Sequence, residues 1–114
     1  MSVIYKLLDR PAWLAASAQE RFDGSPVDLA DGFIHFSTAE QVQETARRHF
    51  NGVADLMLLA VETEALGVPV AWEPSRGGDL FPHLYGAMSV SAVISARPLS
   101  LDAEGAPVIG ILAP

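Results

Sequence analysis

The sequence predicts a single α+β domain that combines a mixed or antiparallel sheet with two main helices. Segments with strand character outnumber those with helical spacing, and both helical segments lie in the first half of the chain. Strands and helices do not alternate uniformly, and there is neither a Walker loop nor a three-glycine dinucleotide fingerprint, which argues against a doubly wound nucleotide fold. Of the 114 residues 50% are hydrophobic, so residues 1–114 can bury one core as one domain.

The N-terminal part predicts a strand followed by a capped helix. Residues 2–8 have apolar side chains on both faces of an extended segment. Asp9 is placed to cap a helix that runs to about Gln19. Pro11 lies in its first turn, where proline is tolerated because backbone N–H groups there have no acceptor within the helix. Residues 21–31 are rich in Asp, Gly, Ser and Pro, which predicts a loop.

A second strand and helix follow this loop. Residues 33–37 predict a short strand. Thr38 and Gln41 have the spacing of a capping box, in which each side chain bonds the free backbone N–H of the other, so a helix is expected to begin at Thr38. Its core-facing residues should be those at helical spacing, Val42, Ala46 and Phe50. Asn51-Gly52 should end it.

The second half of the chain predicts mainly strands. Residues 54–62 are nearly all apolar, which is typical of a central strand covered on both faces. The other expected elements are a strand over 68–73, a glycine-rich loop over 74–80, a short extended piece over 83–85 and a strand over 92–99. Residues 108–112 fit either a last strand or a tail that lies on the body.

Composition excludes several functional classes. Fourteen acidic against seven basic residues give a net charge of −7 without a basic patch, so we expect no binding to duplex nucleic acid. The absence of cysteine excludes disulfides and thiolate chemistry. The N-terminus lacks a signal-peptide pattern, and the longest apolar stretch, 56–61, is far too short to cross a bilayer. We therefore expect a cytoplasmic protein without a membrane partner, and its oligomeric state stays open.

The most informative segment for function is residues 31–38, Asp-Gly-Phe-Ile-His-Phe-Ser-Thr. Strand alternation puts His35 and Ser37 on the face opposite to their apolar neighbours. A helix that begins at Thr38 would direct its free N–H groups toward the same place, where anions and carbonyl oxygens bind. We expect His35 to be catalytic, and Ser37 and Thr38 to bind the ligand. The alternative is a structural His35 that fixes the Asp31-Gly32 turn.

A second segment, residues 81–86, contributes His83 and Tyr85, which share one strand face and are expected to bind the ligand. The alternative is a packed aromatic corner. Glu73 ends an apolar strand and is a candidate catalytic base or acceptor for a ribose hydroxyl, although it can equally pair with Arg76. Arg76 lies in a glycine-rich loop and is a candidate anion-binding residue, or simply part of a surface loop.

These residues together predict one ligand site. Strand phase predicts that His35, Ser37, His83 and Tyr85 line a single cleft. No metal is expected there, because the histidines lack the His-x-x-x-His spacing of a helical zinc site. A serine nucleophile is also not expected, because no Gly-x-Ser-x-Gly turn is present.

The order of these motifs resembles a known bacterial family, the domain of unknown function 952. The resemblance is carried by Ile4-Tyr5-Lys6, Pro11-Ala12-Trp13, residues 31–42, Trp72-Glu73 and residues 81–86. This family implies a small stand-alone α+β domain and no established activity.

A more distant similarity is to the ADP-ribosyltransferase-like superfamily, which includes RNA 2′-phosphotransferases. It implies NAD or an ADP-ribosylated intermediate held between two small sheets. By position, Tyr5-Lys6 corresponds to the first strand motif of that superfamily, His35-Phe36-Ser37 to the second, and Glu73 or Tyr85 to the third.

Two functional hypotheses follow. The first is an enzyme of ADP-ribosyl or nucleotide-phosphate chemistry, with NAD as its candidate cofactor. The second is a non-catalytic domain that binds a small molecule or another protein. In either case the expected small-molecule ligand is anionic or nucleotide-like.

Overall fold

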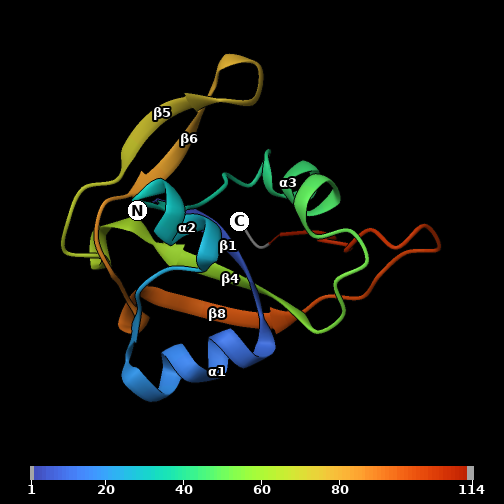
Figure 1. Ribbon diagram of the computed structural model, residues 1–114, viewed down its shortest axis with the longest axis horizontal. Coiled ribbons are helices and arrows are strands. Elements are labelled where there is room, and N and C mark those ends of the chain that lie inside the picture. Colours follow the sequence, from blue (N-terminus) through green and yellow to red (C-terminus); the bar gives the residue numbers. More distant parts are fainter. Residues whose placement is uncertain (1, 113–114) are drawn as a thin grey trace.

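The computed structural model describes residues 2–112, apart from the Arg76 side chain, as two three-stranded antiparallel sheets, a two-stranded ribbon and three α-helices (Figure 1). The first sheet contains, in spatial order, β1 (Val3–Asp9), β4 (Leu56–Glu62) and β8 (Val93–Pro98). The second contains β3 (Ile34–His35), β6 (Asp79–Leu84) and β5 (Ala71–Ser75). The ribbon pairs β2 (Arg21–Phe22) with β7 (Met88–Ser89). The α+β class and the antiparallel pairing are confirmed.

The first sheet is buried on both faces, with β4 at its centre, as its apolar sequence predicts. One face packs against α1 (Arg10–Gln19), and the other packs against α3 (Val42–His49) and the C-terminal segment. The α1 side of the core includes Ile4, Leu8, Ala16, Met57, Leu59 and Val61. The α3 side includes Tyr5, Leu7, Val42, Ala46, Leu56, Leu58 and Ile109.

Of the two longer helices, α1 has its predicted bounds, whereas α3 begins later than predicted. Asp9 Oδ1 accepts a hydrogen bond of 2.8 Å from the Ala12 amide and so caps α1. Gln41 Oε1 accepts one of 3.0 Å from the Thr38 amide, which is half of the predicted capping box. The α3 helix itself starts only at Val42, one turn later than predicted.

The predicted loop over residues 21–31 is wrong in part, because it contains β2 and a short helix, α2 (Pro26–Asp31). Asp28 Oδ2 accepts hydrogen bonds from the Ser25 amide at 2.8 Å and the Ser25 hydroxyl at 2.9 Å. Pro26 stands at the first helical positions, where it is well tolerated. Turn-forming residue types thus start a helix here instead of preventing one.

The predicted loop over residues 74–80 is also wrong in part. β5 and β6 form a hairpin in which Pro74 pairs with Leu80 and Ser75 with Asp79. Only residues 76–78 turn the chain, with Gly77 at φ 76°. Figure 1 shows this hairpin as an arm that extends away from the first sheet.

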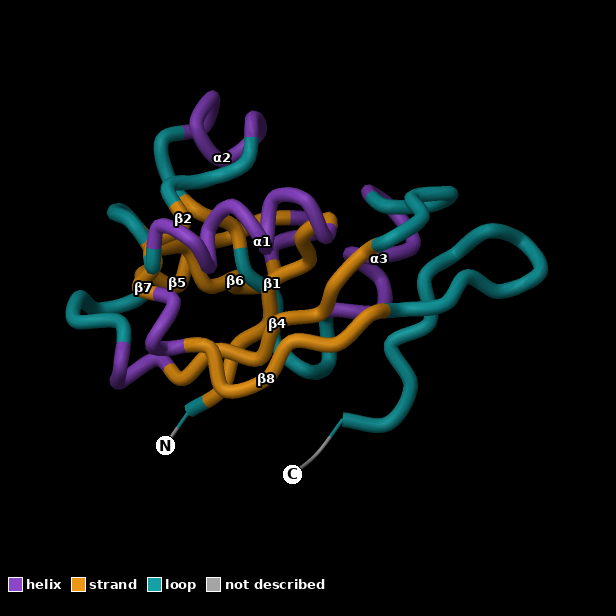
Figure 2. Tube along the Cα trace, turned by 90° about the horizontal axis from the view of Figure 1, so that it is seen from below, coloured by secondary structure: helices purple, strands orange, loops and turns teal. Residues whose placement is uncertain are grey.

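Residues 108–112 form no strand and lie along the body as a tail, with Ile109 buried beside α3 (Figure 2). Gln43 of α3 holds this tail, since its amide group donates to Pro107 O at 2.8 Å and accepts from the Ile109 amide at 3.0 Å. The other connections include the 3-10 turns η1 (Thr63–Ala65) and η3 (Val90–Ala92). No helix within residues 2–112 is long and apolar enough to cross a membrane.

The two sheets are joined where β1 passes the end of β3. Tyr5 and Ser37 form an antiparallel bridge, with reciprocal N–H···O distances of 2.8 and 2.9 Å. This bridge brings β1 next to β3 and the β5–β6 hairpin. It therefore places residues that are distant in sequence around a common space.

Truncation of the central strand should destabilise the fold strongly. Leu59 in β4 is 0% exposed, so we expect Leu59→Ala to lower the free energy of unfolding by about 2–5 kcal/mol in urea titrations. Ile94→Ala in β8 is the control, because Ile94 is 55% exposed and its truncation should change stability by less than about 0.5 kcal/mol. Equal losses in the two variants would contradict a central, doubly covered β4.

Candidate functional site

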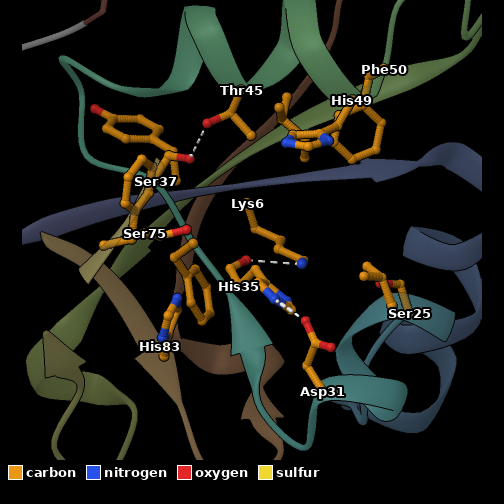
Figure 3. A pocket seen from close by; sticks show the side chains of 15 residues that line it. Lys6, Ser25, Asp31, His35, Ser37, Thr45, His49, Phe50, Ser75 and His83 are labelled. Atoms are coloured by element: carbon orange, nitrogen blue, oxygen red, sulfur yellow. Dashed lines mark hydrogen bonds and ion pairs between the residues drawn. The ribbon is translucent and has the colours of Figure 1, made fainter. Parts of the chain in front are cut away.

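A cavity of about 510 Å³ lies where β1, α2, β3, α3 and the β5–β6 hairpin meet (Figure 3). Its aromatic lining consists of Tyr5, Phe36, Phe50 and Phe81. All three histidines of the chain line it as well, namely His35, His49 and His83. Its other polar lining residues are Lys6, Ser25, Asp31, Ser37, Thr45 and Ser75.

One wall of the cavity is built on a buried ion pair. Lys6 is 5% exposed and Asp28 is 1% exposed, and Lys6 Nζ lies 3.0 and 3.2 Å from the two Asp28 carboxylate oxygens. Lys6 Nζ also donates to the His35 carbonyl oxygen at 2.9 Å. These three acceptors match the three hydrogens of an ammonium group, so Lys6 is fully hydrogen-bonded inside the protein.

Asp28 connects three elements through its carboxylate. Besides Lys6 of β1 and Ser25 at the start of α2, it accepts a hydrogen bond of 3.1 Å from the His35 amide of β3. His35 Nδ1 lies 2.6 Å from Asp28 Oδ1. The wall is therefore held together by one buried acidic side chain.

The pKa values of the pair follow from this environment. Burial alone would raise the pKa of Asp28, but the charge of Lys6 and the hydrogen bonds from Ser25 and His35 outweigh it, so the pKa of Asp28 is lowered. Burial lowers the pKa of Lys6, and its interaction with Asp28 opposes that shift. Asp28 is therefore held in its ionised form.

His35 faces a carboxylate at each ring nitrogen. Nδ1 contacts Asp28, and Nε2 lies 2.9 Å from Asp31 Oδ2 at the end of α2. Figure 3 shows His35 and Asp31 facing each other. Both nitrogens can donate only when both carry a hydrogen. The His35 side chain is 34% exposed and lines the cavity, yet its contact with Asp31 matches the structural alternative, in which it fixes the Asp31-Gly32 turn.

His83 lies directly opposite His35 on β6 and has a different set of partners. The two residues are register partners, with ring centroids 5.5 Å apart. His83 Nδ1 lies 2.7 Å from Glu73 Oε1, and the Tyr85 hydroxyl donates to both Glu73 oxygens at 2.8 and 3.0 Å. The Phe33 ring stacks on His83 with centroids 4.1 Å apart.

These contacts shift the ionisation of the two outer residues. Hydrogen bonds from His83 and then from Tyr85 lower the pKa of Glu73. The hydrogen bond to Glu73 raises the pKa of Tyr85. Glu73 is therefore a stable hydrogen-bond acceptor for His83.

Three of the predicted site residues, His35, Ser37 and His83, meet in the cavity lining. Ser37 is buried, and its hydroxyl lies 2.9 Å from Thr45 Oγ1. Glu73 and Tyr85 stand behind His83 and are not among the lining residues.

Two further predicted ligand-binding residues, Thr38 and Arg76, remain to be placed. Thr38 is not among the lining residues, and the Arg76 side chain lies outside the described part of the structure. Within residues 2–112, no three His, Asp or Glu side chains gather as a metal site. The roles assigned to the predicted site residues stay predictions.

The sequence profile of the family described as "Protein of unknown function (DUF952)" matches residues 7–96. The chain belongs to this family. The crystal structure of the protein CC0527 from Caulobacter crescentus is similar to this DUF952 chain, with 58% sequence identity, 96% of each chain covered and a TM-score of 0.91. The solution NMR structure of CC0527 matches at 58% identity with a TM-score of 0.84, covering 96% of this chain and 95% of that one.

No curated protein matches this DUF952 chain. The family and structure matches support the resemblance to the domain of unknown function 952. They give no support to the more distant resemblance to ADP-ribosyltransferases, and the family description carries no activity.

Sequence reasoning missed the two residues at the centre of the wall, Lys6 and Asp28. Lys6 interrupts the apolar face that Ile4 and Leu8 form on β1, and a charge at such a position requires a partner. Asp28 follows Ser25 at the spacing of a capping box, which was a signal for the start of α2. Nothing in the sequence indicated that these two residues would pair with each other.

Removal of the Asp28 charge should destabilise this DUF952 protein severely. Asp28→Asn leaves the Lys6 ammonium buried without a counter-ion, so we expect a loss of about 3–5 kcal/mol in unfolding free energy, measured with urea. The double variant Lys6→Met, Asp28→Leu should lose less, because it leaves no unpaired buried charge. An Asp28→Asn variant as stable as the wild type would contradict the pairing.

The same pair predicts acid sensitivity. The folded-state pKa of Asp28 lies below its ordinary value of 3.8, so its stabilisation is complete above that pH and is lost as the pH falls through the folded-state pKa. Urea titrations from pH 7 to pH 2 should show the difference between wild type and Asp28→Asn shrinking at the acidic end. A difference independent of pH would indicate that packing, and not charge, causes the loss.

Proposed function

We propose that this protein binds a small, ring-bearing anion of the nucleotide class, such as NAD, ADP-ribose or a mononucleotide, in the 510 Å³ cavity. The observation that carries the proposal is the lining, which combines aromatic rings with three histidines and several hydroxyl groups. Small-molecule sites typically have volumes of about 300–1,000 Å³ and mostly apolar walls with a few polar groups. The volume of this cavity lies within that range, and its lining is richer in polar groups than is typical.

The aromatic residues suit the planar part of such a ligand. Phe36 and Phe81 come from the β3 and β6 region, whereas Tyr5 and Phe50 come from β1 and the end of α3. Rings on several sides of one cavity offer stacking surfaces for a purine or a nicotinamide. An aliphatic ligand would make less use of this lining.

The polar groups suit the sugar and phosphate parts. His49 lines the cavity and is exposed, so it is accessible to a phosphate group. Ser75 also lines the cavity and directly precedes Arg76, which the sequence makes a candidate for anion binding. Lys6 contributes little to phosphate binding, because its hydrogens are already bonded to Asp28 and His35.

Ligand binding is the part of the functional hypothesis that the geometry favours. A catalytic role for His35 would require a free ring nitrogen, whereas both of its nitrogens contact carboxylates. A role of Glu73 as a base on the ligand would require access to the cavity, which His83 and Tyr85 restrict. ADP-ribosyl transfer therefore rests on the distant resemblance alone.

The proposal predicts a thermal shift that depends on the cavity. NAD, ADP-ribose, AMP and adenosine would each be added to the wild type and to two tryptophan variants on α2. At a ligand concentration of about 100 times Kd, binding should stabilise the protein by about 2.7 kcal/mol, or roughly 10 °C in Tm for a domain of this size. Val27 lines the cavity and is 58% exposed, so Val27→Trp should obstruct it and remove the rise without unfolding the protein.

Leu29→Trp is the matched control, because Leu29 lies on the same helix, is 65% exposed and does not line the cavity. It should keep the full rise. A flat response of the wild type to all four compounds contradicts the proposed ligand class. A rise that Val27→Trp and Leu29→Trp retain equally contradicts the location.

A further inference from the structure

The two ring nitrogens of His83 have different surroundings. Nδ1 lies 2.7 Å from the Glu73 carboxylate, whose pKa is lowered and which therefore accepts a hydrogen bond from Nδ1–H. Among residues 2–112, none provides a hydrogen-bond partner for Nε2. In the neutral imidazole, a hydrogen on Nδ1 leaves a lone pair on Nε2.

This Nε2 atom is not sealed inside the protein. His83 is only 6% exposed, yet Glu62 Oε1 is the one fully enclosed side-chain polar atom without a partner among the described residues. His83 Nε2 is therefore not fully enclosed, and His83 lines the cavity. A small molecule in the cavity can reach an unoccupied acceptor.

The group that orients His83 is itself fixed. The Tyr85 hydroxyl donates to the Glu73 carboxylate and lies 2.8 and 3.0 Å from its two oxygens. The Phe33 ring stacks on His83 at a centroid distance of 4.1 Å and makes a tilted contact with Tyr85 at 5.2 Å. The imidazole is thus held by the Glu73 contact at Nδ1 and by the Phe33 ring on one face. A carboxylate that orients a histidine in this way sets its tautomer and stabilises the positive ring that forms when it accepts a proton.

We infer that His83 is the proton acceptor of this cavity, with Glu73 as its positioning residue, and that the ligand presents a hydroxyl group to Nε2. The inference rests on the proposed function for the location of the ligand. In the step it assigns, the ligand O–H bond breaks, its proton bonds to Nε2, and the electron pair stays on the ligand oxygen. The Nδ1 hydrogen remains between the ring and Glu73, which balances the new positive charge. The substrate class is thus a nucleotide-like compound with a reactive hydroxyl.

The other two histidines of the chain serve as internal references. Like His83, His35 has a carboxylate within hydrogen-bond distance of Nδ1. Its Nε2, however, is occupied by Asp31 at 2.9 Å. His49 is exposed at the end of α3, with no carboxylate partner among the ion pairs of the described residues. Of the three rings, His83 alone combines a carboxylate at Nδ1 with an unoccupied Nε2 among the described residues.

Nitrogen-15 NMR on the histidine-labelled full chain tests the tautomer directly, under conditions where the rings are neutral. We expect the wild-type His83 ring to carry its hydrogen on Nδ1 and to have a bare Nε2. In Glu73→Gln the amide can also donate to Nδ1, so this preference should be lost. Tyr85→Phe should keep it, since this variant retains both the contact between Glu73 and His83 and the tilted ring contact with Phe33.

Acylation by diethyl pyrocarbonate tests whether the lone pair is accessible from the cavity. The bare imidazole nitrogen attacks a carbonyl carbon of the reagent, keeps the ethoxycarbonyl group and expels ethyl carbonate. The acylated ring loses its other N–H hydrogen, and ethyl carbonate takes up this proton and breaks down to carbon dioxide and ethanol. Mass spectrometry resolves the three histidine peptides. We expect His83 to react roughly tenfold more slowly in Glu73→Gln than in the wild type, with His49 unchanged as the reference.

The outcomes separate this inference from the proposed ligand class, because neither measurement uses a nucleotide. A wild-type His83 with its hydrogen on Nε2 overturns the inference, as does an acylation rate at His83 that is equal in the wild type and Glu73→Gln. A flat nucleotide screen together with the expected tautomer and rates would reject the nucleotide class and retain His83 as the acceptor. Thermal shifts with nucleotides, combined with a His83 ring that does not carry its hydrogen on Nδ1, would support nucleotide binding and reject His83 as the proton acceptor.

Discussion

The structure depends on one buried carboxylate, that of Asp28. Five donor groups from three elements converge on it, namely Lys6 Nζ, the Ser25 amide and hydroxyl, and the His35 amide and Nδ1. A buried ion pair repays its desolvation only when its remaining hydrogen-bonding capacity is satisfied, and here that capacity is met entirely within the protein. The short helix α2, with six residues, is too short to be stable alone and owes its place to this carboxylate.

The contacts of Asp28 also position the elements that line the cavity. Asp28 fixes α2, and α2 supplies Val27 and Asp31 to the lining. The same carboxylate orients His35, while Lys6 holds the backbone of β3 through the His35 carbonyl oxygen. A ligand site is thus built on an ion pair whose charges are already neutralised, so the pair organises the site more than it attracts the ligand.

The sequence predicts those parts of the fold in which local signals and tertiary packing agree. β1, β4 and α1 follow from strong apolar patterns and from the Asp9 cap. α2 and the hairpin ends were missed because Pro, Gly, Ser and Asp favour turns locally, whereas cross-strand pairing and a capping carboxylate decide the structure. The pairing of Lys6 with Asp28 joins positions 22 residues apart, and a single sequence contains no signal for such a partner.

His35 and His83 show why a site cannot be assigned from residue types alone. Both lie in apolar sequence on paired strands, and both line one cavity. Their chemistry differs because Asp31, at the end of a helix that the sequence did not indicate, occupies the second nitrogen of His35. On the opposing strand no described residue occupies the corresponding atom of His83. One carboxylate orients an imidazole for a ligand, whereas two carboxylates make it part of the wall.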